Sequence, residues 1–163
     1  MPLIRTITVD DFFTKETAEQ ITAVTYDLPK IPCDYGQEIP NFNMVDPDSD
    51  EIFSKVLKIP VKIIKEKSGV FRIPELGIHF ESFKSIKDWV FVVALQESTF
   101  NLFQHKTGAS SALEGYKFNY RNLFEWDITV NYTLKPGQGI FFRPWLFHSF
   151  DQGLIQVFNL GEV

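Results

Sequence analysis

Short apolar runs separated by turn residues fill the chain from Val61 onward, and this pattern constrains the fold more than any other feature. Many short strands at regular spacing are typical of β-sandwiches and β-barrels. The run Trp89–Leu95 (WVFVVAL) is continuously apolar, which predicts a central strand buried on both faces. The other expected strands are Val61–Lys65, Val70–Ile73, Gly77–Phe83, Phe100–Lys106, Asp127–Leu134, Gly139–Phe142 and Leu154–Leu160.

The first third of the chain predicts one strand and two helices. Ile4–Val9 alternates and is β-branched, as strands are. Thr14 is a suitable N-cap for a helix over Lys15–Tyr26, and a second, short helix is expected at Asp50–Lys58. Leu28–Pro47 holds four prolines and little periodicity, so a loop or irregular extended segment is expected there. Helices followed by strands predict a helix layer packed on a β-barrel.

Length and composition are consistent with one soluble domain spanning residues 1–163. The 17 Phe residues suit the half-buried surfaces of sheets better than helix bundles. The net charge of −5 and the lack of a basic run argue against a duplex nucleic-acid binder. The single Cys33 cannot form an intrachain disulfide. The N-terminus lacks a signal-peptide pattern and no run reaches the ~18 apolar residues of a membrane span, so we expect a cytoplasmic protein without membrane contact.

Three histidines, His79, His105 and His148, limit any nitrogen-ligated metal site. His79 and Glu81 are two residues apart, so on a strand both side chains point to the same side. His148 can supply a second imidazole from a distant strand. Non-haem Fe(II) takes two imidazoles and one carboxylate on one face and keeps positions open. A lone histidine in a strand is more often a structural residue, so this pattern needs the support of its surroundings.

The order of features over most of the chain resembles the Fe(II)/2-oxoglutarate oxygenase superfamily, especially its small prolyl-hydroxylase-like members. The resemblance implies a mainly β fold, a double-stranded β-helix or jelly-roll barrel with N-terminal helices packed on it. It also implies that His79, Glu81 and His148 hold Fe(II). The matching segments are Ile7–Phe13 before the first helix, His79-Phe80-Glu81 at the H-x-D position, Trp89–Leu95 after it, Leu134–Phe142 before the distal His148, and the closing run Gln156–Leu160.

Two departures from the family pattern bear on the chemistry. The acid is Glu81 rather than Asp. No Lys or Arg follows His148, where the family carries a cation that pairs with the far carboxylate of 2-oxoglutarate. Lys106, by its position in the middle of the barrel, and Arg143 are the candidate replacements. We therefore expect 2-oxoglutarate to bind weakly unless one of these two cations reaches the pocket.

Three functions remain open at this point. The first is Fe(II)-dependent oxidation, in particular hydroxylation, of a small-molecule or peptide substrate with 2-oxoglutarate as cosubstrate. The second is a non-catalytic jelly-roll module, binding or structural, that has lost cosubstrate binding. The third is a cupin-like metalloprotein in which His105 pairs with His148, although the closely spaced histidines of the first cupin motif are missing.

Overall fold

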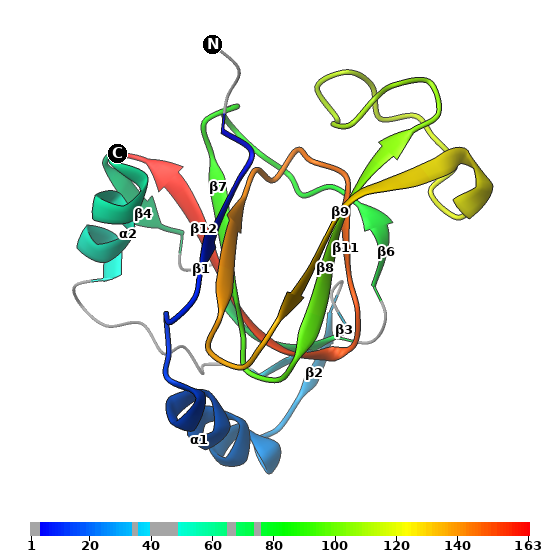
Figure 1. The fold of residues 1–163 in the computed structure, drawn as a ribbon. Coiled ribbons are helices and arrows are strands. Elements are labelled where there is room, and N and C mark those ends of the chain that lie inside the picture. The colour runs from blue at the N-terminus through cyan, green and yellow to red at the C-terminus, as the bar shows by residue number, and fades with distance from the viewer. Residues whose placement is uncertain (1–3, 34–35, 40–48, 65–67, 74–75) are drawn as a thin grey trace.

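The computed structural model describes residues 4–33, 36–39, 49–64, 68–73 and 76–163, and these form a β-barrel with two flanking helices (Figure 1). Every strand pair is antiparallel. No helix in the described part of the chain is long and apolar enough to cross a bilayer. In chain order the elements are β1 (Thr6–Val9), α1 (Lys15–Tyr26), β2 (Ile31–Cys33), β3 (Gly36–Ile39), α2 (Ser49–Leu57), β4 (Val61–Ile63), β5 (Gly69–Ile73), β6 (Leu76–His79), β7 (Trp89–Ala94), β8 (Ser98–His105), the 3-10 turn η2 (Leu123–Glu125), β9 (Trp126–Leu134), β10 (Gly139–Phe142), β11 (His148–Phe150) and β12 (Gly153–Glu162).

Two sheets make the barrel. The larger has the strand order β1-β10-β7-β12-β5-β3-β2, with β4 also paired to β12, and the smaller has the order β6-β11-β8-β9. This antiparallel, mainly β architecture is the jelly-roll type that the sequence predicts. A long excursion, residues 106–125, leaves the smaller sheet between β8 and β9 and rises beside one end of the barrel (Figure 1).

Strand β7 occupies the interior position predicted for the apolar run. It pairs with β10 on one side and β12 on the other, and all six of its residues are buried. Alternate residues face opposite sides of the sheet, and both sides are covered. Val90 and Val92 face the barrel interior, whereas Phe91 and Val93 pack outside it. The absence of polar alternation in this run therefore reflects burial on both faces.

The helices cover the outer face of the larger sheet. Thr14 caps α1 as predicted, with its hydroxyl accepting from the Thr17 amide at 3.1 Å. Ala18 and Ile21 of α1 pack against Leu95 and neighbouring buried side chains. Phe53 of α2 packs into a separate cluster on the same outer face, made of Val61, Trp89, Phe91, Val93, Phe141, Phe158 and Leu160.

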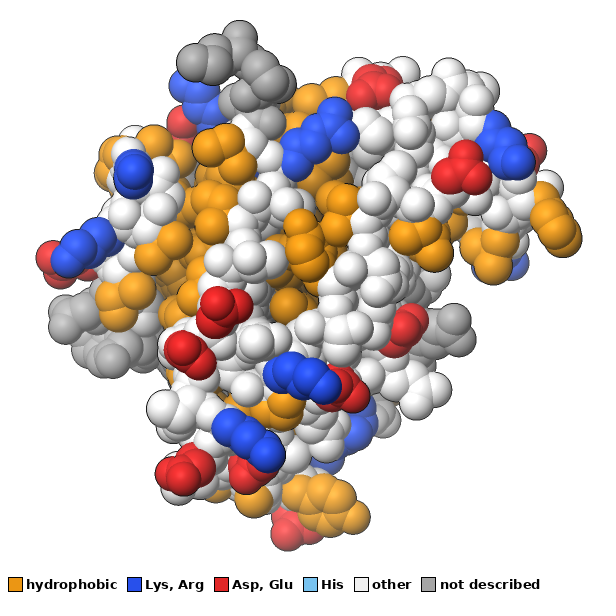
Figure 2. All heavy atoms as spheres, in the orientation of Figure 1, with side chains coloured by type: hydrophobic (Ala, Val, Ile, Leu, Met, Phe, Trp, Pro, Cys, Tyr) orange, Lys and Arg blue, Asp and Glu red, His pale blue; other side chains and the backbone are white. Residues whose placement is uncertain are grey.

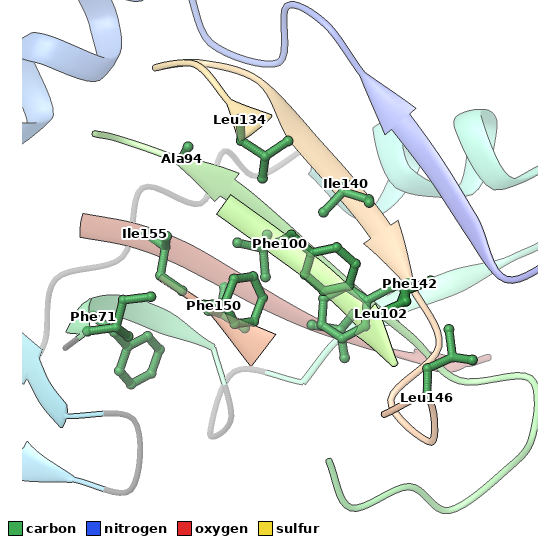
Figure 3. Packing of buried hydrophobic residues seen from close by; sticks show 14 of the residues in the cluster. Phe71, Ala94, Phe100, Leu102, Leu134, Ile140, Phe142, Leu146, Phe150 and Ile155 are labelled. Atoms are coloured by element: carbon green, nitrogen blue, oxygen red, sulfur yellow. The ribbon is translucent and has the colours of Figure 1, made fainter. Parts of the chain in front are cut away.

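The barrel interior is filled by a large apolar cluster (Figure 3). Both sheets contribute inward-facing residues to it, and Figure 3 shows aromatic and aliphatic side chains meeting between them. On the face shown in Figure 2, hydrophobic side chains gather toward the middle, while many charged ones lie toward the margins and the α1 end. The buried cluster consists of Phe71, Ile73, Val90, Val92, Ala94, Phe100, Leu102, Leu134, Ile140, Phe142, Trp145, Leu146, Phe150, Ile155 and Val157.

The segment Leu28–Pro47, predicted as a loop or irregular extended segment, is more regular in its described part. It contains two short strands, β2 and β3, that pair with each other and extend the larger sheet through β5. Pro32 is tolerated because β2 is the last strand of the sheet, where one set of backbone groups needs no partner. Residues 34–35 and 40–47 of this segment, and Lys65 of the strand predicted after it, lie outside the described residues.

Candidate metal centre

Two neighbouring strands of the smaller sheet bring the predicted ligands together. His148 of β11 is the cross-strand partner of His79 at the end of β6, and their ring centroids are 4.3 Å apart. Ile78 and Phe147 face the opposite side of this sheet, where they join an outer aromatic cluster. The two-residue strand period thus turns His79 inward, and Glu81 follows with the same parity. The Glu81 amide donates to the Pro144 carbonyl at 2.7 Å, which fixes the backbone beyond β6.

The side chains of His79, Glu81 and His148 converge as predicted. His79 Nε2 lies 3.0 Å from Glu81 Oε1, and His148 Nε2 lies 3.4 Å from the same oxygen. One ligand atom from each residue falls within 4.8 Å of the others. The side chain of His148 is fully buried, while those of His79 and Glu81 are 25% and 16% exposed. The group is therefore closed on the His148 side and reaches solvent past the other two residues.

Backbone carbonyls fix both imidazole rings. His79 Nδ1 lies 2.7 Å from the Gly77 carbonyl oxygen, and His148 Nδ1 lies 2.7 Å from that of Leu146. A carbonyl oxygen can only accept, so each Nδ1 must carry the proton and donate it. In a neutral ring the lone pair is then on Nε2. This is the arrangement by which carbonyls orient metal-ligating histidines in known metal sites. His79 Nε2 lies 3.0 Å from Glu81 Oε1, which can only accept, so without a metal this nitrogen also carries a proton, and a bound cation would displace it.

The electrostatics keep a negative charge at the centre of the group. Burial alone would raise the pKa of Glu81, but the imidazoles of His148 and His79 outweigh it and hold that pKa far below its usual value. Burial lowers the pKa of His148, and the neighbouring His79 lowers it further. Burial also acts to lower the pKa of His79, but the hydrogen bond and charge of Glu81 reverse the shift and raise it. Glu81 is thus an anion beside an imidazole that burial keeps neutral.

The donor set fits a divalent cation. His148 Nε2 is buried and lacks a well-formed hydrogen bond among the described residues, with Glu81 Oε1 3.4 Å away. A buried polar atom without a hydrogen bond costs free energy unless something else satisfies it. A metal ion bound between two Nε2 lone pairs and a carboxylate would satisfy all three atoms. Two imidazoles and one carboxylate with open positions are the ligands of non-haem Fe(II).

Phenylalanine side chains line the barrel interior next to this group. The rings of Phe142, Phe100 and Phe150 lie 4.6, 5.8 and 5.8 Å, centroid to centroid, from the His148 ring. Phe100 also packs on Phe142 at 4.9 Å and on Phe150 at 5.1 Å. His148 thus stands at the boundary between a polar mouth and an apolar interior.

The two candidate cations lie in different surroundings. Lys106 is exposed, just beyond the end of β8. Arg143 is only 5% exposed, and its guanidinium donates to the carbonyls of Ile4, Lys87 and Asp88 while stacking on Trp89 at 3.5 Å. The predicted role of either residue in binding a cosubstrate carboxylate stays a prediction.

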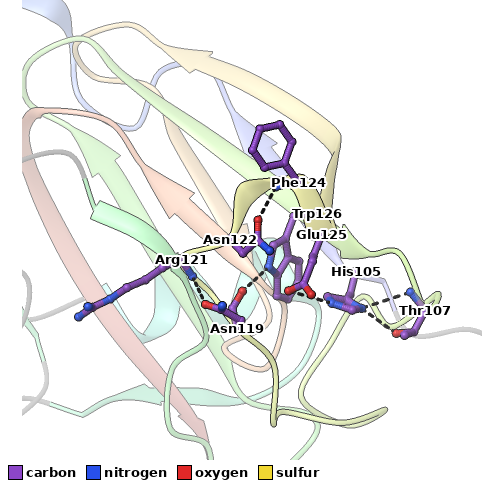
Figure 4. Close-up of polar contacts among 8 residues, drawn as sticks. All are labelled: His105, Thr107, Asn119, Arg121, Asn122, Phe124, Glu125 and Trp126. Atoms are coloured by element: carbon purple, nitrogen blue, oxygen red, sulfur yellow. Dashed lines mark hydrogen bonds and ion pairs between the residues drawn. The ribbon is translucent and has the colours of Figure 1, made fainter.

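His105 belongs to a separate site on the outer face of the smaller sheet (Figure 4). Its Nδ1 lies 2.9 Å from the Thr107 hydroxyl, and its Nε2 lies 3.9 Å from Glu125. The ring stacks on Phe118 at 4.3 Å and meets Trp126 edge-on at 4.9 Å. Among the described residues, the group of converging potential ligands is His79, Glu81 and His148, without His105.

Several residues that shape the centre were not singled out from the sequence. The Gly77 and Leu146 carbonyls orient the imidazoles, and no side-chain pattern encodes such backbone contacts. Phe142 lies on a strand predicted with its observed bounds and Phe100 on one predicted with shifted ends, whereas the strand of Phe150 was not predicted. The available signal was that Phe150 follows His148 by two residues, which places both on the same side of a strand.

Comparison with known proteins supports the fold. No family model matches the chain, and no curated protein matches it. Among solved structures, HygX from Streptomyces hygroscopicus with nickel and 2-oxoglutarate bound aligns with a TM-score of 0.64 and 12% identity over 97% of this chain and 83% of its own. The same protein with iron bound gives 0.56 and 11% over 98% and 83%. SnoN, a non-heme alpha ketoglutarate dependent epimerase from nogalamycin biosynthesis, gives 0.64 and 10% over 96% and 78%. At such low identity the likeness establishes the fold alone, a cupin-like jelly-roll barrel.

Proposed function

We propose that this chain is an Fe(II)-dependent oxidising protein in which His79, Glu81 and His148 hold the metal. One observation carries the proposal: two imidazole Nε2 atoms and one carboxylate oxygen converge while both Nδ1 atoms are tied to carbonyl oxygens. That tie leaves Nε2 of each ring as the nitrogen that binds a metal once the ring is neutral.

The chain's own residues would position the metal, offset part of its charge and exclude water from one side of it. Glu81 contributes one negative charge, which offsets part of the charge of a divalent ion. His148 is shielded from water by the interior, and the partly exposed His79 lies toward solvent. Bound iron would supply the oxidation chemistry with O₂, while the protein supplies geometry and a water-poor environment. The substrate is a small molecule or a peptide segment that approaches from the side of His79.

The structural neighbours support a metal in this type of barrel, since HygX has been solved with nickel and with iron. They also raise 2-oxoglutarate as a cosubstrate, and the sequence predicts that its far carboxylate needs Lys106 or Arg143 as a partner. The described residues offer the metal suitable ligands, whereas the side chains clustered in the interior behind them carry no charge.

A second candidate function is a binding or structural module with the same barrel. The closely packed phenylalanines next to His148 favour it, because a filled interior leaves little room for a cosubstrate. This candidate requires no bound metal, so metal analysis separates the two.

Metal binding tests the proposal directly. Protein reconstituted with Fe(II) without oxygen, and separately with Mn(II), should bind close to one equivalent by elemental analysis and calorimetry. His79→Ala and Glu81→Gln should each weaken binding by roughly a hundredfold or more, because loss of even outer-shell partners costs 10–100-fold. His105→Gln is the matched control and should bind as the wild type does. Absence of binding in the wild type, or equal binding in all four proteins, would refute the metal centre.

A further inference from the structure

The rings of Phe100, Phe142 and Phe150 form a wall behind His148 and limit which ligands can reach the metal centre. We propose that the barrel interior is closed to 2-oxoglutarate, and that the centre binds external ligands only from the mouth, without recognising a second carboxylate. This inference rests on the proposed metal site at His79, Glu81 and His148.

The closure comes from three rings that contact one another as well as His148. Phe142 belongs to the larger sheet, whereas Phe100 and Phe150 belong to the smaller one, so the rings bridge the barrel (Figure 3). All three are at most 3% exposed. A ligand bound to the metal with its far end inside the barrel would have to displace at least one of these rings. Closely packed protein interiors do not yield space without a cost in stability.

The interior also offers no positive charge among the described residues. The last strand, β12, turns Ile155 and Val157 inward, where a cation for the far carboxylate would be needed. The residues clustered in the interior include no charged side chain, and Tyr132 packs against them. Arg143 is held by carbonyls and Trp89, and Lys106 is exposed. A carboxylate transferred into this interior would lose its hydration without gaining a charged partner, which is strongly unfavourable.

The remaining route to the metal is the mouth of the barrel, the solvent-facing side formed by His79 and Glu81. The side chains of His79 and Glu81 keep 25% and 16% of their surface exposed, while His148 keeps none. A ligand that chelates the metal from this side keeps its far end in solvent or against the mouth. Its affinity is then set by the chelating head, and the chemical nature of its tail has little effect.

Two 2-oxo acids that share one chelating head test this in the wild type. Pyruvate lacks the second carboxylate that 2-oxoglutarate carries. In the Mn(II)-loaded protein we expect calorimetry to give dissociation constants within about threefold of each other, or no binding of either acid. The charge-transfer absorption of the Fe(II)-loaded protein with each acid gives an independent reading. A preference for 2-oxoglutarate of about tenfold or more, equal to 1.4 kcal/mol, would overturn the inference because something must then recognise the far carboxylate.

Neighbouring phenylalanines of β10 provide a matched pair of variants. Phe142→Ala removes a ring of the wall, whereas Phe141→Ala removes an equally buried ring that faces the outer cluster. We expect only Phe142→Ala to bind 4-methyl-2-oxopentanoate more tightly, by about tenfold, because the new cavity is apolar. Phe142→Leu, a smaller change, should show the same trend if Phe142→Ala does not fold.

The outcomes separate this inference from the proposed function. Metal binding with no gain for 4-methyl-2-oxopentanoate in the folded Phe142 variants would show that this ring is not the barrier. A gain for 2-oxoglutarate instead would show that a cation reaches the interior. Either result overturns the inference and leaves the metal centre standing. Failure of all the proteins to bind metal removes the metal centre itself.

Discussion

Replacing Arg143 tests whether this side chain holds the fold together or binds a cosubstrate. Its Nε donates to the Ile4 carbonyl at 2.9 Å, and its Nη1 donates to the carbonyls of Lys87 at 2.9 Å and Asp88 at 3.3 Å. Burial lowers its pKa to about 10, against the favourable charge of Asp88, so the guanidinium remains protonated at neutral pH. It thereby links the segment before β1, the segment before β7 and the loop that leads to β11.

The expected magnitude follows from these contacts. Two hydrogen bonds from a charged donor contribute about 1.5 kcal/mol each, and the third shares a donor with one of them. Stacking of the guanidinium on Trp89 at 3.5 Å adds about 1 kcal/mol. Arg143→Ala should therefore lower the free energy of unfolding by about 4 kcal/mol, a large part of the roughly 5–15 kcal/mol typical of a domain. For a chain of this size that corresponds to a fall in Tm of about 8–16 °C.

Urea denaturation followed by tryptophan fluorescence measures the change. Arg143→Lys keeps the charge but not the forked geometry, so about half the loss is expected. Exposed Arg121 provides the control, and Arg121→Ala should stay within about 0.5 kcal/mol of the wild type. If Arg143→Ala unfolds like Arg121→Ala but abolishes 2-oxoglutarate binding, the structural role argued here is wrong and the cosubstrate role is right.

Three further predictions concern separate parts of the molecule. Gly137→Ala should destabilise the protein by roughly 3 kcal/mol or more in urea, because φ is +94° and an added Cβ would collide with the Phe13 backbone; an unchanged midpoint would contradict this. Thr14→Ala should cost about 1 kcal/mol and Thr14→Ser much less, since only the alanine loses the cap to the Thr17 amide; equal losses would exclude the cap as the cause. Mn(II) at a free concentration of a hundred times its Kd stabilises the protein by about 2.7 kcal/mol, so removing it with a chelator should lower the Tm by about 5–11 °C. The Tm of Glu81→Gln should not change on chelation. A similar fall in both proteins would indicate metal bound elsewhere.

Local patterns predicted the longer strands and missed three short ones, β2, β3 and β11, that are defined by their neighbours. The run Trp89–Leu95 was identified because every position is apolar, and the structure places it between two other strands. Ile31–Cys33 was not identified, because a three-residue strand containing proline has no periodicity to detect. It exists because β3 offers a partner at the edge of the sheet. His148–Phe150 is equally short and depends on β6 and β8 on either side.

The candidate ligands could be found from the sequence, but their surroundings could not. The two-residue spacing of His79 and Glu81 fixes their common direction once the backbone is extended. The inward direction of Val157 depends instead on its pairing with Val92 of β7, a long-range register that spacing does not encode. The lack of a cation after His148 is therefore visible in the sequence, whereas the wall of rings beside that residue is visible only in the three-dimensional structure.

The position of β6 gives the metal centre a second consequence. This four-residue strand is an outer strand of the smaller sheet, and among the described strands it pairs with β11 alone, through His79 with His148 and Leu76 with Phe150. A metal ion shared by His79 and His148 would cross-link the two strands at one of those pairs. Loss of the ion should then loosen β6 before the rest of the barrel, as a local opening visible in amide hydrogen exchange. Ligand binding at the mouth and the fraying of one sheet edge would thus be coupled through the same two imidazoles.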